Sequence, residues 1–306
     1  MGARDRSSAG CSRRRDRRFA GDAPRAGCSP GRGGTACHRE VFDLRIWVYA
    51  TPADLPADPP RVGAAVAIDV LRATSTIAQA LWAGARAVMP YLEPEEARRA
   101  AAAATATGSS GKPDSSGSAG LPGSPGAGPH LPPLLAGERG GVQIPGFDLG
   151  NSPREMTPER VRGREIYVTT TNGTRAILRA AALGPVYLAA LVNRAAVVDR
   201  LAALGADVAV VCAGGQGAFS LEDIVGAGAL VDGLAARGIG VPGNDLALAA
   251  VALFRHWEGR LAELFRQTDH GRRLLELGLA ADLDWCARLD VLPVAPCYRE
   301  GRITAA

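Results

Sequence analysis

The sequence has almost no lysine and few aromatic residues. Of its 35 basic residues only Lys112 is a lysine, and Phe, Trp and Tyr together make up 5% of the 306 residues. The lysine shortage indicates a GC-rich genome more than a chemical requirement, so a single arginine is weak evidence for a functional site. Because aromatic residues are scarce, Ala, Val and Leu must fill the core, and a hydrophobic content of 47% is enough for a sizeable one.

Several protein classes are excluded by what is missing. The six cysteines show no CxxC spacing, which argues against a structural zinc site or a disulfide framework and predicts a reducing, cytoplasmic location. No apolar stretch reaches membrane-spanning length without a polar interruption, so we expect no membrane contact. Residues 1–40 contain ten Arg and four acidic residues, a net charge of +6, which leaves −2 for the rest of the chain. A body this close to neutral gives no reason to expect nucleic-acid binding.

Composition also divides the chain. Residues 1–40 are rich in Arg, Gly, Ser and Pro and have almost no aliphatic residues, so we expect a disordered tail or a gene start placed too early. Residues 41–306 are expected to form a single domain. Residues 105–133 are low in complexity and read as a flexible insert within it, because the strand and helix pattern resumes directly afterwards.

Apolar runs that read as strands alternate with helical patterns from residue 44 onward. This order predicts an α/β fold with three layers, α/β/α, around a mainly parallel sheet. The expected strands are 44–50 (an edge strand), 64–68, 86–91, 134–137, 166–169, 186–190, 207–212 and 291–294. The expected helices are 74–83, 95–104, 173–182, 194–204, 221–237 and a series within 244–288.

Asp69 directly follows the predicted central strand 64–68 and precedes a helix start rich in hydroxyls. A carboxylate at the carboxyl end of a parallel strand is placed to hold Mg²⁺ or to act as a nucleophile. The structural alternative is a helix cap or an ion pair with Arg72. We favour the functional interpretation because of the position at the strand end.

Two further segments carry polar side chains beside glycines. Glu138 and Arg139 follow a strand and precede two glycines, so the backbone can approach a ligand closely and Arg139 can bind an anionic oxygen pair. Asp148 and Ser152 lie in a stretch that is equally typical of a plain turn. This segment alone does not decide whether these two residues bind a ligand or form a plain turn.

The segment after strand 166–169 combines hydroxyls with a helix start. Thr171 and Asn172 precede the helix, and its free amides and these side chains make an anion site. Arg175 lies in the first turn, where a cation opposes the helix dipole unless it meets an anion. The alternative is that Asn172 is a simple N-cap.

Cys212 ends a strand and is followed by a glycine-rich loop that leads to Asp223. The CX5R pattern of cysteine phosphatases is absent because position 218 is Ala218, so Cys212 is not expected to be a nucleophile. Ser220 and Asp223 match a capping box, which is the structural reading of these two residues. Asp223 and its neighbour Glu222 are also metal-ligand candidates. His256 and His270 lack any ligand motif, and both are expected to be structural or solvated.

Five motifs occur in a fixed order in residues 41–300. They are IDVLRATST, GERGG, GFDLGNSP, TTTNGTRA and CAGGQGAFSLED. Each is ordinary alone, but together they resemble the 2-phosphosulfolactate phosphatase family. The resemblance implies a Mg²⁺-dependent phosphoric monoester hydrolase that converts 2-phosphosulfolactate to sulfolactate and phosphate, a step of coenzyme M biosynthesis. Alternatives are a phosphatase for another small phosphorylated acid and a non-catalytic anion-binding protein.

The chemistry of phosphate-ester hydrolysis then distributes roles among these residues. We expect a small anionic, phosphorylated substrate, and the sequence leaves a homo-oligomer open. The catalytic candidates are Asp69, Glu138 and Asp223. The metal-ligand candidates are Asp69, Asp148 and Asp223. The substrate-binding candidates are Arg72, Arg139, Ser152, Thr171, Asn172 and Arg175. The sequence does not separate direct attack by water from a phospho-aspartyl intermediate, nor the carboxylate that binds metal from the one that activates water.

Overall fold

The computed structural model describes residues 44–108 and 131–306 of the chain. Its strands are β1 Leu44–Tyr49, β2 Ala64–Ile68, β3 Ala87–Pro90, β4 Leu134–Arg139, β5 Val142–Gln143, β6 Glu165–Thr169, β7 Val186–Ala189, β8 Val208–Cys212, β9 Gly240–Pro242, β10 Pro296–Arg299 and β11 Arg302–Ala305. Its α-helices are α1 Ala73–Trp82, α2 Pro94–Gly108, α3 Pro158–Val161, α4 Gly173–Ala180, α5 Arg194–Leu204, α6 Leu221–Ala235, α7 Asp245–Trp257, α8 Leu261–Gln267, α9 Asp269–Glu276 and α10 Ala280–Cys286.

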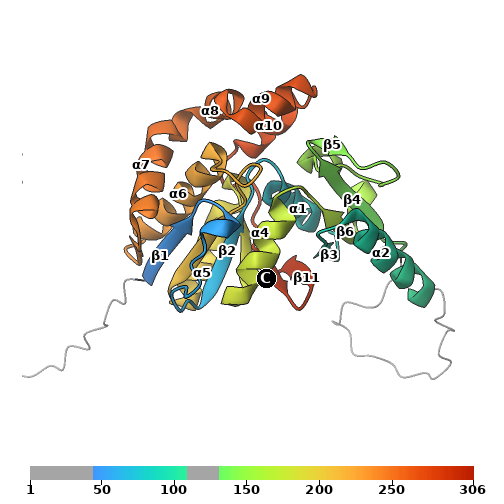
Figure 1. Ribbon diagram of the computed structural model, residues 1–306, viewed down its shortest axis with the longest axis horizontal. Coiled ribbons are helices and arrows are strands. Elements are labelled where there is room, and N and C mark those ends of the chain that lie inside the picture. Colours follow the sequence, from blue (N-terminus) through green and yellow to red (C-terminus); the bar gives the residue numbers. More distant parts are fainter. Residues whose placement is uncertain (1–43, 109–130) are drawn as a thin grey trace, which may run out of the picture. The chain divides into compact units, whose positions relative to one another are not determined.

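The described strands form one sheet in the order β5-β4-β6-β3-β11-β10-β7-β2-β8-β1-β9, with helices on both faces (Figure 1). The pairs β5 with β4, β10 with β7, β10 with β11 and β11 with β3 are antiparallel, and the other pairs are parallel. The predicted three-layer α/β/α fold with a mainly parallel sheet is therefore confirmed.

The sheet consists of two parallel groups, β4-β6-β3 and β7-β2-β8-β1-β9, with the hairpin β10–β11 between them. Strands β1 and β3, which come before and after β2 in the sequence, lie on opposite sides of it. In sheets of this kind, ligands bind at the carboxyl ends of the strands where the order reverses direction. The topology therefore directs attention to the loop that follows β2.

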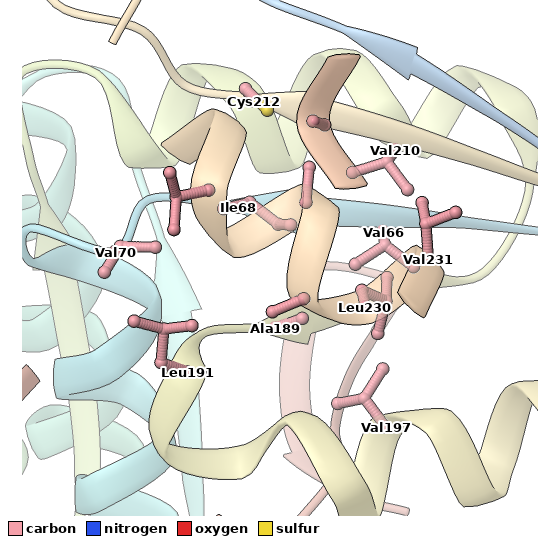
Figure 2. Close-up of a cluster of buried hydrophobic side chains, with 14 of the residues drawn as sticks. Val66, Ile68, Val70, Ala189, Leu191, Val197, Val210, Cys212, Leu230 and Val231 are labelled. Carbon is pink, nitrogen blue, oxygen red and sulfur yellow. The ribbon is translucent and has the colours of Figure 1, made fainter. Parts of the chain in front are cut away.

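The core is densest around β2, whose five residues are all buried. Val66 and Ile68 face α5 and α6 together with alternate residues of β8, as the close-up in Figure 2 shows. Ala65 and Ala67 face the opposite layer, where α1 and α4 pack. A strand covered on both faces reads as a continuous apolar run, which is why the sequence identified it. Each fully buried aliphatic side chain stabilises the fold by roughly 1.5–3 kcal/mol, so the loop after β2 has a firm support.

Two strand predictions are wrong, one about the edge of the sheet and one about the last strand. The strand beginning at Leu44 is not an edge strand, because the short β9 pairs with its outer side. Its alternating burial reflects helices on one face only, which a sequence pattern cannot distinguish from an edge. Residues 291–294 form no strand: Pro293 has no N–H to donate, and the N–H of Val294 bonds to the carbonyl of Leu292 (2.9 Å). The last strands instead form the hairpin β10–β11, where Glu300 and Gly301 both have positive φ, as a tight hairpin turn requires.

The predicted tail, residues 1–40, lies outside the described residues, and so do residues 109–130 of the predicted insert. Helix α2 continues to Gly108, so ordered chain extends into the segment that was assigned to the insert. At its other end Pro132 accepts a hydrogen bond from Arg164 (2.8 Å). Within the described residues, no helix combines the length and apolar character needed to span a membrane.

Candidate active site

A cavity of about 720 Å³ opens where the parallel strands end. Its walls come from the loops after β2, β6 and β8, from the end of β4, and from the start of α9. Six of the residues proposed from the sequence meet in its lining. They are Asp69, Arg72, Glu138, Thr171, Asn172 and Asp223. The structure therefore brings these predicted residues, which are far apart in the chain, together in one site.

Asp69 lies buried at the floor of this site, directly after β2. Its Oδ1 accepts a hydrogen bond from the backbone N–H of Ala73 (3.2 Å), and its Oδ2 has no such bond to any described residue. Burial raises the pKa of Asp69 to about 7, and the charges of Glu138 and Glu222 add to the rise. A Cβ on Gly173 would lie 2.5 Å from Oδ2, so only glycine fits where α4 begins. The carboxyl group is thus held at one oxygen, free at the other, and poised to exchange a proton near neutral pH.

Asp223 lies in the first turn of α6 and connects two loops. Its Oδ1 accepts from the N–H of Val70 (2.9 Å) and its Oδ2 from the N–H of Gly214 (3.0 Å). The capping-box reading is wrong, because the carboxylate bonds to these loops and the Ser220 side chain makes no cap hydrogen bond. Burial raises the pKa of Asp223 well above its ordinary value, and the charges of Asp69 and then Glu222 raise it further. Burial likewise raises the pKa of Glu222.

Glu138 ends β4 with its carboxylate fully engaged. Its Oε2 accepts from the N–H of Gly141 (2.8 Å) and from the hydroxyl of Thr171 (3.1 Å), and its Oε1 accepts from the N–H of Thr171 (2.8 Å). It is buried and makes no ion pair with any described residue. Three donors on one carboxylate fix the loops after β4 and β6 against each other. The geometry therefore gives Glu138 a positioning task. The neighbouring Asn172 lines the cavity, and its side chain makes no hydrogen bond to described residues.

Arg72 forms a buried ion pair that the sequence did not reveal. Its Nη1 lies 2.6 Å from Oδ2 of Asp282, and each side chain is 2% exposed. Oδ1 of Asp282 accepts from the hydroxyl of Ser152 (2.8 Å), so Ser152 acts behind the cavity wall. Nη2 of Arg72 donates to the carbonyl of Gly141 (3.2 Å), whereas its Nε is buried without a partner among the described residues. This network holds a guanidinium beside the carboxylates.

Three other proposed residues are not brought to the cavity. Arg139 donates to the carbonyls of Glu138 and Leu92, at 2.9 Å each, and lies outside the lining. Asp148 is exposed, and its Oδ2 accepts from the N–H of Leu135 in β4 (2.8 Å), which fixes its loop to that strand. Arg175 is exposed on α4, also outside the lining. The binding roles proposed for these residues gain no support from the geometry.

Residues from the C-terminal helices complete the cavity. His270 and Arg273 of α9 line it, and Asp282 of α10 stands behind it. His270 was expected to be structural or solvated, and Asp282 belongs to no motif. The sequence of a helix indicates which of its faces is buried, but not which other element that face packs against. No sequence signal therefore pointed to His270, Arg273 or Asp282. Glu222, a metal-ligand candidate from the sequence, also lines the cavity.

The residues present fit a hard cation. The predicted ligand set is not assembled, because Asp148 is remote, and no group of three or more His, Cys, Asp or Glu in the described part of the chain is arranged around one point. Mg²⁺, however, uses one or two carboxylates and retains waters and substrate oxygens as its other ligands. Asp69, Glu222 and Asp223 are buried together: the charge of Glu222 raises the pKa of Asp69, and the charges of Asp69 and Glu222 raise the pKa of Asp223. A cation among them would relieve that repulsion.

Cys212 is buried at the end of β8. Burial raises the pKa of its thiol well above the ordinary value, and the charge of Asp223 contributes. A thiol that resists ionisation is a poor nucleophile. This agrees with the expectation that Cys212 is not a nucleophile.

Comparison with known proteins adds an independent observation. The family model described as 2-phosphosulpholactate phosphatase matches residues 49–110 and 129–301. A relative from Symbiobacterium thermophilum, named "Probable 2-phosphosulfolactate phosphatase", is 45% identical over 81% of this chain and 96% of its own length. Relatives with the same name from Thermosynechococcus vestitus and Gloeobacter violaceus are 40% and 44% identical, each over 83% of this chain and over 96% and 94% of their own lengths. The chain belongs to the 2-phosphosulpholactate phosphatase family.

Proposed function

We propose that the protein is a Mg²⁺-dependent phosphoric monoester hydrolase that converts 2-phosphosulfolactate and water to sulfolactate and phosphate. One observation carries the proposal: in a chain of this family, buried carboxylates and a buried arginine converge in one cavity at the strand ends. In the reaction, oxygen from water bonds to phosphorus, the ester P–O bond breaks, and the leaving oxygen takes a proton.

The charge of the cavity supports the need for a cation. Its lining contains five carboxylates, from Asp69, Glu138, Glu222, Asp223 and Asp269, but only two guanidinium groups. A multiply charged anion would be repelled from such a lining. Glu222 and Asp223, neighbours in the first turn of α6, would hold Mg²⁺, which neutralises phosphoryl charge and lowers the pKa of bound water.

Asp69 is the best proton acceptor for the attacking water. A general base works best when its pKa lies near the working pH, and burial raises the pKa of Asp69 toward that range. Its Oδ2 has no competing hydrogen bond among the described residues. Arg72 places positive charge beside the site, and the unpaired amide of Asn172 can donate to a phosphate oxygen. Glu138 and Asp282 hold the loops and the guanidinium in place.

The proposal is tested by a screen of small phosphomonoesters, with 2-phosphosulfolactate among them, in Mg²⁺ and in excess EDTA. We expect phosphate release from 2-phosphosulfolactate in Mg²⁺ and loss of release in EDTA. Preference for another phosphorylated acid would change the substrate and keep the reaction class. Full activity in EDTA would remove the metal from the proposal, and no turnover of any ester would favour an anion-binding protein.

A further inference from the structure

Helix α9 contributes part of the cavity lining from a segment that is far in the sequence from β2 and β4. Of its residues, His270 and Arg273 are three positions apart, so their side chains share one face of the helix. Figure 1 shows α8, α9 and α10 running together along one end of the sheet. Neither residue has a task in the hydrolysis described above.

The support beneath these side chains is firm. Thr268 caps α9 by accepting from the N–H of Gly271 (3.1 Å), and its hydroxyl donates to the carbonyl of Phe265 (3.1 Å). A Cβ on Gly271 would lie 1.6 Å from that same carbonyl oxygen, so α8 and α9 touch at a position where only glycine fits. The face that carries His270 and Arg273 is therefore fixed relative to the cavity.

The positive charge of Arg273 is only weakly paired with neighbouring groups. Its Nη1 lies 3.3 Å from Oε2 of Glu276, and the two side chains are 50% and 68% exposed. Exposed pairs of this kind contribute little, so most of the guanidinium donors are free for a ligand. Burial lowers the pKa of His270, and the charge of Arg72 lowers it further. The imidazole is thus neutral at neutral pH and offers one N–H donor.

The size of the cavity is the second independent observation. A volume of about 720 Å³ is far more than one phosphate group occupies. Asp69, Glu222 and Asp223 mark where the phosphoryl chemistry takes place, and His270 and Arg273 line the same cavity without a part in that chemistry. The remaining space is large enough for the rest of a small substrate.

We propose that His270 and Arg273 form a subsite for a second anionic group, a carboxylate or a sulfonate, on the substrate whose phosphate is hydrolysed at Asp69. This inference rests on the proposed phosphatase function and adds a rule of selectivity to it. Arg273 supplies the charge and His270 a hydrogen bond, so the enzyme selects phosphomonoesters that carry a further acidic group. Both are binding residues and take no part in bond breaking.

Arg273→Gln tests the subsite, and Arg266→Gln is its matched control. Arg266 also loses one exposed ion pair, with Asp284, but it does not line the cavity. The kcat/KM of each protein is measured with 2-phosphosulfolactate and with 4-nitrophenyl phosphate, which has no second anion. We expect Arg273→Gln to lower kcat/KM for 2-phosphosulfolactate at least tenfold more than for 4-nitrophenyl phosphate, mainly through KM. Arg266→Gln should match the unchanged protein with both.

A binding measurement separates this inference from the proposed function. Calorimetry with sulfolactate, which has no phosphate, should show at least tenfold weaker binding to Arg273→Gln than to the unchanged protein or to Arg266→Gln. Equal losses with both substrates, or equal sulfolactate affinity in all three proteins, would overturn the subsite while the phosphatase stands. An unchanged protein that hydrolyses no phosphomonoester would overturn the phosphatase proposal, and with it the substrate assigned to the subsite.

Discussion

Replacing Asp69 with asparagine removes the charge of the carboxylate and keeps its shape. The amide oxygen of the new residue can still accept the hydrogen bond from Ala73, and the amide nitrogen takes the place of Oδ2, which has no partner among the described residues. The loop after β2 should therefore stay folded. What is lost is the group that we assign as proton acceptor.

The expected loss of activity follows from the role of Asp69 as general base. A positioned general base contributes about a hundredfold to ten-thousandfold, and a hundredfold equals about 3 kcal/mol of lost transition-state stabilisation. We expect kcat for phosphate release in Mg²⁺ to fall at least a hundredfold, with a smaller change in KM. Asp284→Asn, on an exposed aspartate outside the cavity, is the control. Near-normal turnover in Asp69→Asn would reduce Asp69 to a helix cap and refute the mechanism.

The same variant should lose activity but gain folding stability at neutral and higher pH. Burial raises the pKa of Asp69 from 3.8 to about 7, so the folded state binds a proton that the unfolded state has released between these values. The carboxyl group therefore costs stability progressively as pH rises from about 4 to about 7, by up to ~4 kcal/mol. Urea unfolding in EDTA should show no gain for Asp69→Asn at pH 4 and a gain of this order at pH 8. A difference that does not depend on pH would contradict the burial argument.

Four further substitutions test other parts of the account. Asp148→Asn should keep kcat within about twofold, because Asp148 is outside the cavity; a hundredfold loss in the phosphatase assay would restore it as a metal ligand. Gly173→Ala should reduce activity at least tenfold, since its Cβ would lie 2.5 Å from Oδ2 of Asp69; normal kinetics would show that the loop yields freely. Glu222→Gln should raise the Mg²⁺ concentration for half-maximal activity about tenfold or more, and an unchanged Mg²⁺ titration would exclude Glu222 as a ligand. Cys212→Ser should retain most activity, and complete loss in a folded protein would reverse its assignment.

The strand ends could be predicted from sequence because the signals are local. An all-apolar run such as β2 followed by Asp69 indicates a buried parallel strand with a polar group at its end, and the chain order then brings Asp69, Glu138 and Asp223 to one edge. Turn-forming residues were the weak point, since the Asp148 carboxylate, which the sequence proposed as a metal ligand, fixes its loop to β4. Composition cannot decide between these uses.

The contribution of the C-terminal helices could not be predicted. Helix α9 reads as an ordinary surface helix, and its place beside the cavity depends on how α8, α9 and α10 pack on one another. The same holds for Asp282, whose partner Arg72 lies 210 positions away in the chain. Such contacts are set by tertiary packing, so His270, Arg273 and Asp282 emerged only from the structure.

The most direct test of the central claim is hydrolysis of 2-phosphosulfolactate in ¹⁸O-labelled water by the purified full-length chain with Mg²⁺. The account predicts equal amounts of sulfolactate and phosphate, with the label in the phosphate, because water attacks phosphorus and the P–O bond breaks. Label in sulfolactate, or no phosphate at all with the folded protein, would contradict it.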